Sequence, residues 1–227
     1  MSLTQELDRA RALDEAELAD AIESIGFECT RCGACCTREE TESGETEPHT
    51  ATVFPDEVRR LQEAGDGAGE EREWRDVARP MPYGLSEGED GPEGETFEWA
   101  LQNDACGDCA FYAEEDGLGA CTVHESRPLI CETYPFSVAL DGTAEPAGEP
   151  VDSEGLVRAH ECEGLGRDIP REEAEELAAA LKERAIRELE EAIALREQYE
   201  PASVGDGDVV VHDSEGAKRP DGTPVGR

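Results

Sequence analysis

Four cysteines lie within eight residues near the start of this chain, in the run FECTRCGACCT, and they constrain its fold more than any other feature. They are Cys29, Cys32, Cys35 and Cys36, with the spacing C-x2-C-x2-C-C. Two residues between cysteines let one tight turn aim both sulfurs at a single metal ion, while backbone amides donate hydrogen bonds to the thiolates. Adjacent cysteines normally point apart, so we expect Cys35 and Cys36 to serve different metal ions or different atoms of one cluster. The chain must then supply further ligands downstream.

Five more cysteines follow after a gap of about seventy residues, and they can meet the first group only through folding. They are Cys106, Cys109, Cys121, Cys131 and Cys162. Residues 1–25 form an acidic amphipathic stretch without the apolar core of a secretory signal, and no segment approaches the roughly 18 apolar residues of a membrane span. We therefore expect a cytoplasmic protein, and in that reducing compartment such a pattern favours metal binding. Disulfides and simple buried thiols are the alternatives.

The charge of the chain is extreme, with 57 Asp and Glu against 20 Lys and Arg and a net charge of -37. Lys182 and Lys218 are its only lysines. Acid excess with few lysines is typical of proteins adapted to molar salt, where charge repulsion is screened over about 3 Å. We therefore expect an extreme halophile as the source. The acidity also argues against nucleic acid and anionic membranes as partners.

The apolar content is low, because Leu, Ile, Val and Phe together number 39 of 227 residues. With so high a net charge, this composition is also typical of disorder. A structural zinc site contributes on the order of 10 kcal/mol of folding free energy, which is comparable with the net stability of a domain. We therefore predict a fold that depends on metal and on salt.

The pattern of apolar residues predicts an α+β fold, in which an N-terminal helix and a long C-terminal helix flank a small, cysteine-rich, metal-organised core of short strands and turns. A helix is expected at 14–25 with Asp14 as N-cap and Gly26 at its end, one half-buried strand at 95–101, and a long helix at 168–199. Pro128 is expected to set up a single helical turn that presents Cys131. In the alternating strand, Phe97, Trp99 and Leu101 share one face.

Four segments are predicted along the chain. They are an N-terminal helical segment (1–26), a cysteine-cluster domain (27–166) with a solvated acidic insertion at about 63–95, a C-terminal helix packed on it (167–200), and an acidic tail that is either flexible or a short hairpin (201–227).

The cysteine-containing runs resemble those of the YkgJ family of cysteine-cluster proteins, whose CxxCxxCC domain is described as zinc- or iron-chelating. The resemblance rests on FECTRCGACC, on CAFY from Cys109, on CTVHESRPLICETYPF from Cys121, and on Cys162 before GLG. It implies eight metal ligands: Cys29, Cys32, Cys35, Cys36, Cys109, Cys121, Cys131 and Cys162. Its most specific part is R-P-x-x-C-x-x-Y-P-F, in which Arg127 and Tyr134 are expected to lie next to the ligands.

This chain departs from the family pattern at two positions. Cys106 is an additional cysteine that forms CGDC with Cys109, and His124 stands where the family usually has tyrosine. Cys106, His124 and His160 are alternate ligands. Arg31 and Arg38 are further candidates, with Arg127, for offsetting thiolate charge.

Eight thiolates suit two four-cysteine sites, or one such site with the remainder at another centre. The spacing does not choose between zinc and iron, because C-x2-C-x2-C also begins the run that holds a [4Fe-4S] cluster. The favoured function is a metal-binding protein for structure, storage or delivery.

Two other functions stay open. The first is an Fe-S dependent enzyme or accessory domain related to methyl transfer, since the resemblance extends to the cysteine motif of bacterial flagellin lysine N-methylases. The second is a metal-scaffolded protein-interaction module. No glycine-rich nucleotide fingerprint, P-loop, GxSxG or HExxH motif is present to support the enzyme alternative, so the balance leans towards a protein that is not an enzyme.

Overall fold

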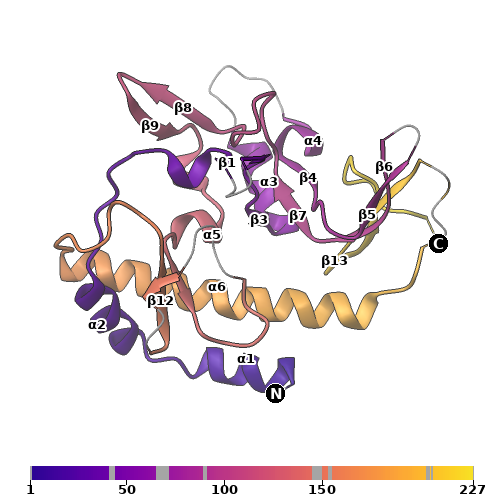
Figure 1. Cartoon of the computed structure of the whole chain (residues 1–227). Coiled ribbons are helices and arrows are strands. Elements are labelled where there is room, and N and C mark those ends of the chain that lie inside the picture. The colour runs from indigo at the N-terminus through magenta and orange to yellow at the C-terminus, as the bar shows by residue number, and fades with distance from the viewer. Residues whose placement is uncertain are drawn as a thin grey trace. The chain divides into compact units, whose positions relative to one another are not determined.

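The computed structural model describes residues 2–40, 44–64, 72–88, 91–144, 150–152, 155–202, 205 and 207–226. Helices alternate with several small sheets, and the longest element is a C-terminal helix, so the predicted α+β class is confirmed (Figure 1). The chain divides into two compact units. Unit 1 comprises 1–37, 112–120 and 127–192, and unit 2 comprises 38–111, 121–126 and 193–227.

Unit 1 contains most of the helices. They are α1 (Leu3–Arg11), α2 (Glu15–Ile25), η1 (Ala34–Cys36), α5 (Leu129–Glu132) and α6 (Arg171–Gln198), whose last turns belong to unit 2. The strands are β8 (Tyr112–Glu115), β9 (Leu118–Cys121), whose last residue belongs to unit 2, β10 (Phe136–Val138), β11 (Pro150–Asp152) and β12 (Val157–His160). Strands β10, β12 and β11 form an antiparallel sheet in that order.

The predicted helix at 14–25 is present as α2, for the reasons its sequence suggests. The Asp14 carboxylate accepts hydrogen bonds from the amides of Ala16 and Glu17, and Gly26 ends the helix with a positive φ of 76°. Figure 1 shows α1 and α2 beside α6. Ion pairs of exposed side chains join these helices: Arg11 with Glu190, Lys182 with Glu15, and Arg171 with Asp20 and Glu23.

Unit 2 is built around two small sheets. Its elements are β1 (Glu39–Glu40), β2 (Thr46–Glu47), β3 (Thr52–Val53), α3 (Pro55–Glu63), α4 (Trp74–Val77), β4 (Ala78–Pro80), β5 (Leu85–Gly88), β6 (Gly91–Phe97), β7 (Trp99–Leu101), η2 (His124–Ser126), β13 (Val209–Asp213) and β14 (Gly216–Lys218). One sheet has the order β14-β13-β6-β5 and the other β3-β7-β4, while β1 and β2 pair separately.

The single strand predicted at 95–101 is wrong, because the chain breaks at Glu98. This residue has a φ of 66°, and the left-handed turn sends β6 and β7 into different sheets. Phe97 is 43% exposed, whereas Trp99 is fully buried, so the two do not share a face. Glu98 thus acts as a corner between the two sheets.

The region predicted as a solvated insertion also contains regular structure. Within 63–95 the structure has α4, β4, β5 and the start of β6, and Trp74, Val77 and Ala78 are buried. Of the two alternatives for the tail, the described residues adopt the hairpin: β13 and β14 pair antiparallel, and β13 pairs parallel with β6. We call residues 209–218 the C-terminal hairpin.

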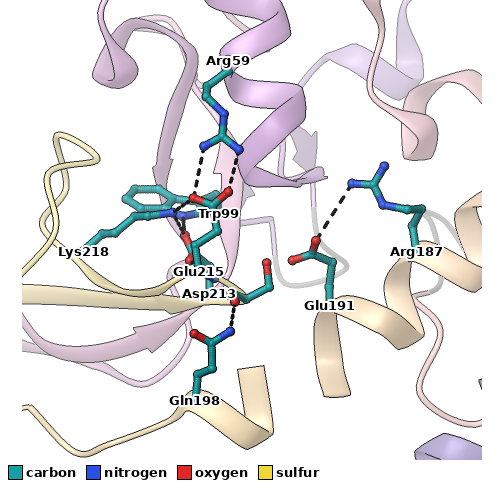
Figure 2. Close-up of polar contacts among 9 residues, drawn as sticks. Arg59, Trp99, Arg187, Glu191, Gln198, Asp213, Glu215 and Lys218 are labelled. Carbon is teal, nitrogen blue, oxygen red and sulfur yellow. Dashed lines mark hydrogen bonds and ion pairs between the residues drawn. The ribbon is translucent and has the colours of Figure 1, made fainter. Parts of the chain in front are cut away.

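One buried ion pair and one exposed ion pair hold the C-terminal hairpin to the core of unit 2 (Figure 2). The Asp213 carboxylate accepts hydrogen bonds from Trp99 Nε1 at 2.8 Å and from Lys218 Nζ at 2.7 Å. Glu215 pairs with Arg59 of α3 at 2.6 Å and with Lys218 at 2.7 Å. The hydrogen bonds from Arg59, and after them those from Lys218, lower the pKa of Glu215 to about 2.

None of the helices in the described parts of the chain has the length and apolar character that crossing a bilayer requires.

Candidate metal centre

All nine cysteines are thiols, and six of the eight predicted ligands belong to unit 1. Cys29 and Cys32 are exposed, whereas Cys35, Cys36, Cys131 and Cys162 are half-buried. The first four lie in residues 27–37, which we call the thiol loop. The loop follows α2 and ends in the single 3-10 turn η1.

Two residues with a left-handed backbone conformation determine how the thiol loop turns. Arg31 has a φ of 59° and Gly33 a φ of 81°, and the Cys36 amide donates to the Gly33 carbonyl at 2.8 Å. A positive φ is unfavourable for a residue with a Cβ. The two residues between each pair of cysteines therefore make tight turns, as the spacing predicts.

The β8–β9 hairpin holds the thiol loop from one side. The Gly119 amide donates to the Arg31 carbonyl at 2.7 Å, and Arg31 Nε donates to the Gly119 carbonyl at 2.8 Å. A Cβ at Gly33 would lie 2.5 Å from the Tyr112 hydroxyl oxygen, and one at Gly119 would lie 2.9 Å from the Arg31 carbonyl oxygen. Both approaches therefore require glycine.

The sulfurs of Cys35 and Cys36 lie 3.7 Å apart. The expectation that these adjacent side chains point apart is therefore wrong, because the turn of η1 brings both sulfurs together. The hydrogen bond with Cys36 and, to a smaller extent, the positive charge of Arg127 lower the pKa of Cys35 to about 7. Arg127 thus lies where its positive charge favours the Cys35 thiolate.

Cys162, the last predicted ligand along the chain, lies in a segment that contacts the thiol loop. The Glu28 amide donates to the Gly164 carbonyl at 3.1 Å, and Phe27 forms a β-bridge with Leu165. The Gly164 amide donates to Cys162 Sγ at 3.4 Å, which is the kind of N–H···S bond that supports a metal-bound thiolate.

The titration of Cys162 reflects its surroundings. Burial raises the pKa of this thiol, and neighbouring thiolates raise it further. Those neighbours are Cys32, Cys35 and Cys29. The structure therefore brings Cys162 within electrostatic range of the thiol loop.

Cys131 lies in α5, the single helical turn that the Pro128 motif predicts, and its amide donates to the Pro128 carbonyl at 2.9 Å. Tyr134 donates from its hydroxyl to the carbonyl of Glu161, the residue before Cys162. Tyr134 therefore ties the Cys131 segment to the Cys162 segment.

His160, an alternate ligand, is fully buried, and its Nε2 lies 3.1 Å from Ser137 Oγ.

The other cysteines lie in unit 2, together with His124. Cys109 is buried, Cys121 half-buried and Cys106 exposed. The CGDC turn is capped by Asp104, whose carboxylate accepts from the amides of Cys106 at 2.7 Å and Asp108 at 3.0 Å.

The remaining polar candidates, Arg38 and His124, pair with carboxylates of unit 2. Arg38 pairs with Asp108 at 3.1 Å, and exposed His124 lies 3.4 Å from Glu125.

Across the described ranges, no three side chains of Cys, His, Asp or Glu type already have the arrangement that would enclose a metal ion. The thiol loop nevertheless has the chemistry that a thiophilic metal requires: clustered sulfurs, a low-pKa thiol and a nearby arginine.

Sequence reasoning missed the support for this cluster. The β8–β9 hairpin and α6 touch the ligand segments through contacts between residues far apart in the sequence. A glycine inside the cysteine run, Gly33, was the one local signal of a close neighbour, and it does not identify Tyr112 as that neighbour.

Residues 28–163 match a protein-family model described as "CxxCxxCC: Putative zinc- or iron-chelating domain". No curated protein and no solved structure matches the chain.

Proposed function

The chain belongs to the CxxCxxCC family of zinc- or iron-chelating domains, whose model matches residues 28–163 of 227, and on this premise we propose that the clustered thiols of unit 1 bind zinc or iron. The proposal concerns metal retention rather than catalysis.

The separation of the Cys35 and Cys36 sulfurs carries this proposal. A tetrahedral ion with metal–sulfur bonds of about 2.3 Å holds its thiolates about 3.8 Å apart. The observed 3.7 Å supports two ligands on one ion, rather than on two different ions. Without a metal, two half-buried thiols this close would gain little from each other, because a thiol is a weak hydrogen-bond donor and acceptor.

The ligands proposed for this centre come from three segments of unit 1. They are Cys29, Cys32, Cys35, Cys36, Cys131 and Cys162. A single tetrahedral ion and a [4Fe-4S] cluster each use four thiolates, so six thiolates leave two for a second metal centre. Bound metal would neutralise thiolate charge and fix the loop, and Arg127 would offset the remaining negative charge. Cys109 and Cys121 of unit 2 remain predicted ligands.

The metal content and the colour of the purified protein distinguish zinc from an iron-sulfur cluster. We propose purification without oxygen from the native or a high-salt host, followed by elemental analysis and an absorption spectrum. Zinc gives a colourless protein, whereas an iron-sulfur cluster gives a brown one with sulfide-to-iron charge transfer. The cytoplasmic location, the halophilic source and the enzyme and interaction-module alternatives stay predictions.

Cysteine variants test the ligand assignment. Cys35→Ser should lower the metal content per chain and Cys162→Ser should do the same, because each removes a thiolate of the cluster. Cys106→Ser is the matched control, since Cys106 is exposed and lies in unit 2. Full metal content in both Cys35→Ser and Cys162→Ser would contradict the proposal.

A further inference from the structure

The side chain of Arg184 is buried in unit 1, although it carries a charge. It belongs to α6, which lies outside the family-matched residues 28–163, and it is 2% exposed. Burying a guanidinium is costly unless hydrogen bonds and an opposite charge replace its water. The partners of Arg184 therefore show what this charge holds in place.

Arg184 donates hydrogen bonds to the segment that follows Cys131. Its Nη1 donates to Thr133 Oγ1 at 3.0 Å and to the Phe136 carbonyl at 3.1 Å, and its Nη2 donates to the Ala144 carbonyl. The planar guanidinium presents these donors in fixed directions, so it sets the spacing of the three acceptors.

Glu188, one turn further along α6, completes the grip. Its Oε1 accepts from Arg184 Nε at 2.7 Å, and its Oε2 accepts from the Ala144 amide at 3.0 Å. Ala144 is therefore held through both its carbonyl and its amide. We call Arg184 and Glu188 together the α6 clamp.

The α6 clamp acts on the position of Cys131 through Thr133. Cys131 lies in α5, a helix of four residues, which is too short to be stable by itself. Thr133 caps this turn, since its amide and its hydroxyl donate to the Leu129 carbonyl at 3.0 Å and 2.7 Å. The clamp thus fixes the end of the turn that presents Cys131.

The same clamp reaches the Cys162 segment through β10. Phe136 is the register partner of Ala159 in β12, and the His160 amide donates to the Pro135 carbonyl at 3.0 Å. Cys162 follows two residues after His160. One buried arginine therefore connects to the backbones of two ligand-bearing segments.

We infer that Arg184 and Glu188 are positioning residues of the metal centre: they hold the Cys131 segment, and through β10 and β12 the Cys162 segment, against the thiol loop. The inference rests on the proposed metal binding. It adds that a helix outside the family-matched residues determines how tightly the metal is held.

The same helix supplies a matched control. Arg187 and Glu191 form an ion pair at the same i, i+4 spacing, 4.0 Å apart, with side chains 27% and 18% exposed (Figure 2). Replacing Arg187 changes the charge and the helix propensity of α6 as replacing Arg184 does, and it leaves the hydrogen bonds of Arg184 to Thr133, Phe136, Ala144 and Glu188 in place.

The experiment compares Arg184→Gln with Arg187→Gln in the full-length, metal-loaded protein at high salt. Transfer of metal to a competing chelator gives the affinity, and mass spectrometry after alkylation gives the protection of each cysteine. We expect Arg184→Gln to weaken metal binding about 10–100-fold, the range for partners that orient metal ligands. Cys131 should become reactive in the loaded protein while Cys29 and Cys32 stay protected.

If Arg184→Gln does not fold, Glu188→Gln tests the inference. This substitution keeps the shape of the glutamate side chain and removes its charge. It should weaken metal binding relative to Glu191→Gln. Arg184→Lys should recover only part of the affinity, since lysine keeps the positive charge but lacks the planar set of guanidinium donors.

Several outcomes would overturn the inference. Equal metal affinity in the 184 and 187 variants would overturn it, as would equal exposure of all six unit 1 cysteines in a folded Arg184→Gln protein, which indicates a purely structural role. If Arg184→Gln does not fold, equal affinity in Glu188→Gln and Glu191→Gln would overturn it. A wild-type protein that takes up no metal would overturn the proposed function, and the inference with it.

Discussion

The thiol loop of unit 1 and the C-terminal hairpin of unit 2 are both held in place by few residues, but by different forces. The hairpin buries Val210, Val211 and the Lys218–Asp213 pair against Trp99. The thiol loop is held by backbone hydrogen bonds to Gly119 and Gly164 and leaves Cys29 and Cys32 exposed. The hairpin is thus completed by its own side chains, whereas the thiol loop, on the proposed function, is completed by metal.

This difference shows two ways in which an acidic chain with few large apolar residues can order a segment. A buried ion pair stabilises when both partners are present and well bonded, and it becomes strongly destabilising when one is removed. Thiolates crowded together repel one another until a cation joins them. Substitutions should therefore affect the two regions through different readouts, stability in one and metal content in the other.

The largest effect is expected from Lys218→Met. Asp213 is 3% exposed, and loss of its cationic partner leaves a buried carboxylate that accepts only uncharged hydrogen bonds, from Trp99 Nε1 and the Glu215 amide. Breaking such a pair costs about 3–5 kcal/mol. Chemical denaturation of the metal-loaded protein should show this loss, with the metal content per folded chain unchanged.

Lys182→Met is the matched control, because Lys182 is the only other lysine and pairs with Glu15 on the surface of unit 1. Its loss should change the unfolding free energy by less than about 1 kcal/mol. Equal effects of the two substitutions would mean that the hairpin is not held by its buried pair.

An intermediate effect is expected from Gly33→Ala. The left-handed φ of 81° costs about 1–2 kcal/mol for a residue with a Cβ, and the new methyl would also meet the Tyr112 hydroxyl at 2.5 Å. The thiol loop should shift, and the metal content should fall. Elemental analysis with a parallel melt measures both.

Gly117→Ala separates the two causes, since Gly117 has a φ of 79° with no atom within 4 Å of the added Cβ. This variant should lose a similar amount of folding free energy through its left-handed backbone, and it should keep its metal. If Gly33→Ala also retains full metal, the loop does not need the close approach of Tyr112.

The smallest effect is expected from acid titration of the C-terminal hairpin. Arg59 and Lys218 lower the pKa of Glu215 from 4.5 to about 2. Because the folded pKa lies below the ordinary value, this stabilisation is fully present above pH 4.5 and is lost as the pH falls towards about 2. Glu215→Gln should flatten this part of the pH dependence of the unfolding free energy, followed by tryptophan fluorescence. An unchanged slope would contradict the assignment.

Local signals in the sequence predicted much of the fold. Asp14 and Gly26 delimit α2, and Pro128 begins the turn that carries Cys131. The break at Glu98 could not be predicted, because the alternating pattern continues through it. Its cause is non-local: β6 pairs with β13, more than 100 residues away in the sequence.

The candidate site was predictable in composition and not in arrangement. The cysteine spacing and the family resemblance identified the thiols, but they placed Cys35 and Cys36 apart. The clamp of Arg184 on Thr133 and the approach of Gly119 to Arg31 join residues 51 and 88 positions apart. Such contacts depend on how the segments pack, which spacing alone does not determine.

Hydrogen exchange of the metal-loaded and metal-stripped protein at high salt tests the central claim most directly. We predict that metal removal abolishes amide protection in the thiol loop and at 129–136, while β6, β7 and β13 keep theirs. Equal protection of the thiol loop in both forms, with complete metal removal shown by elemental analysis, would contradict the claim that metal bound by these thiols orders the loop.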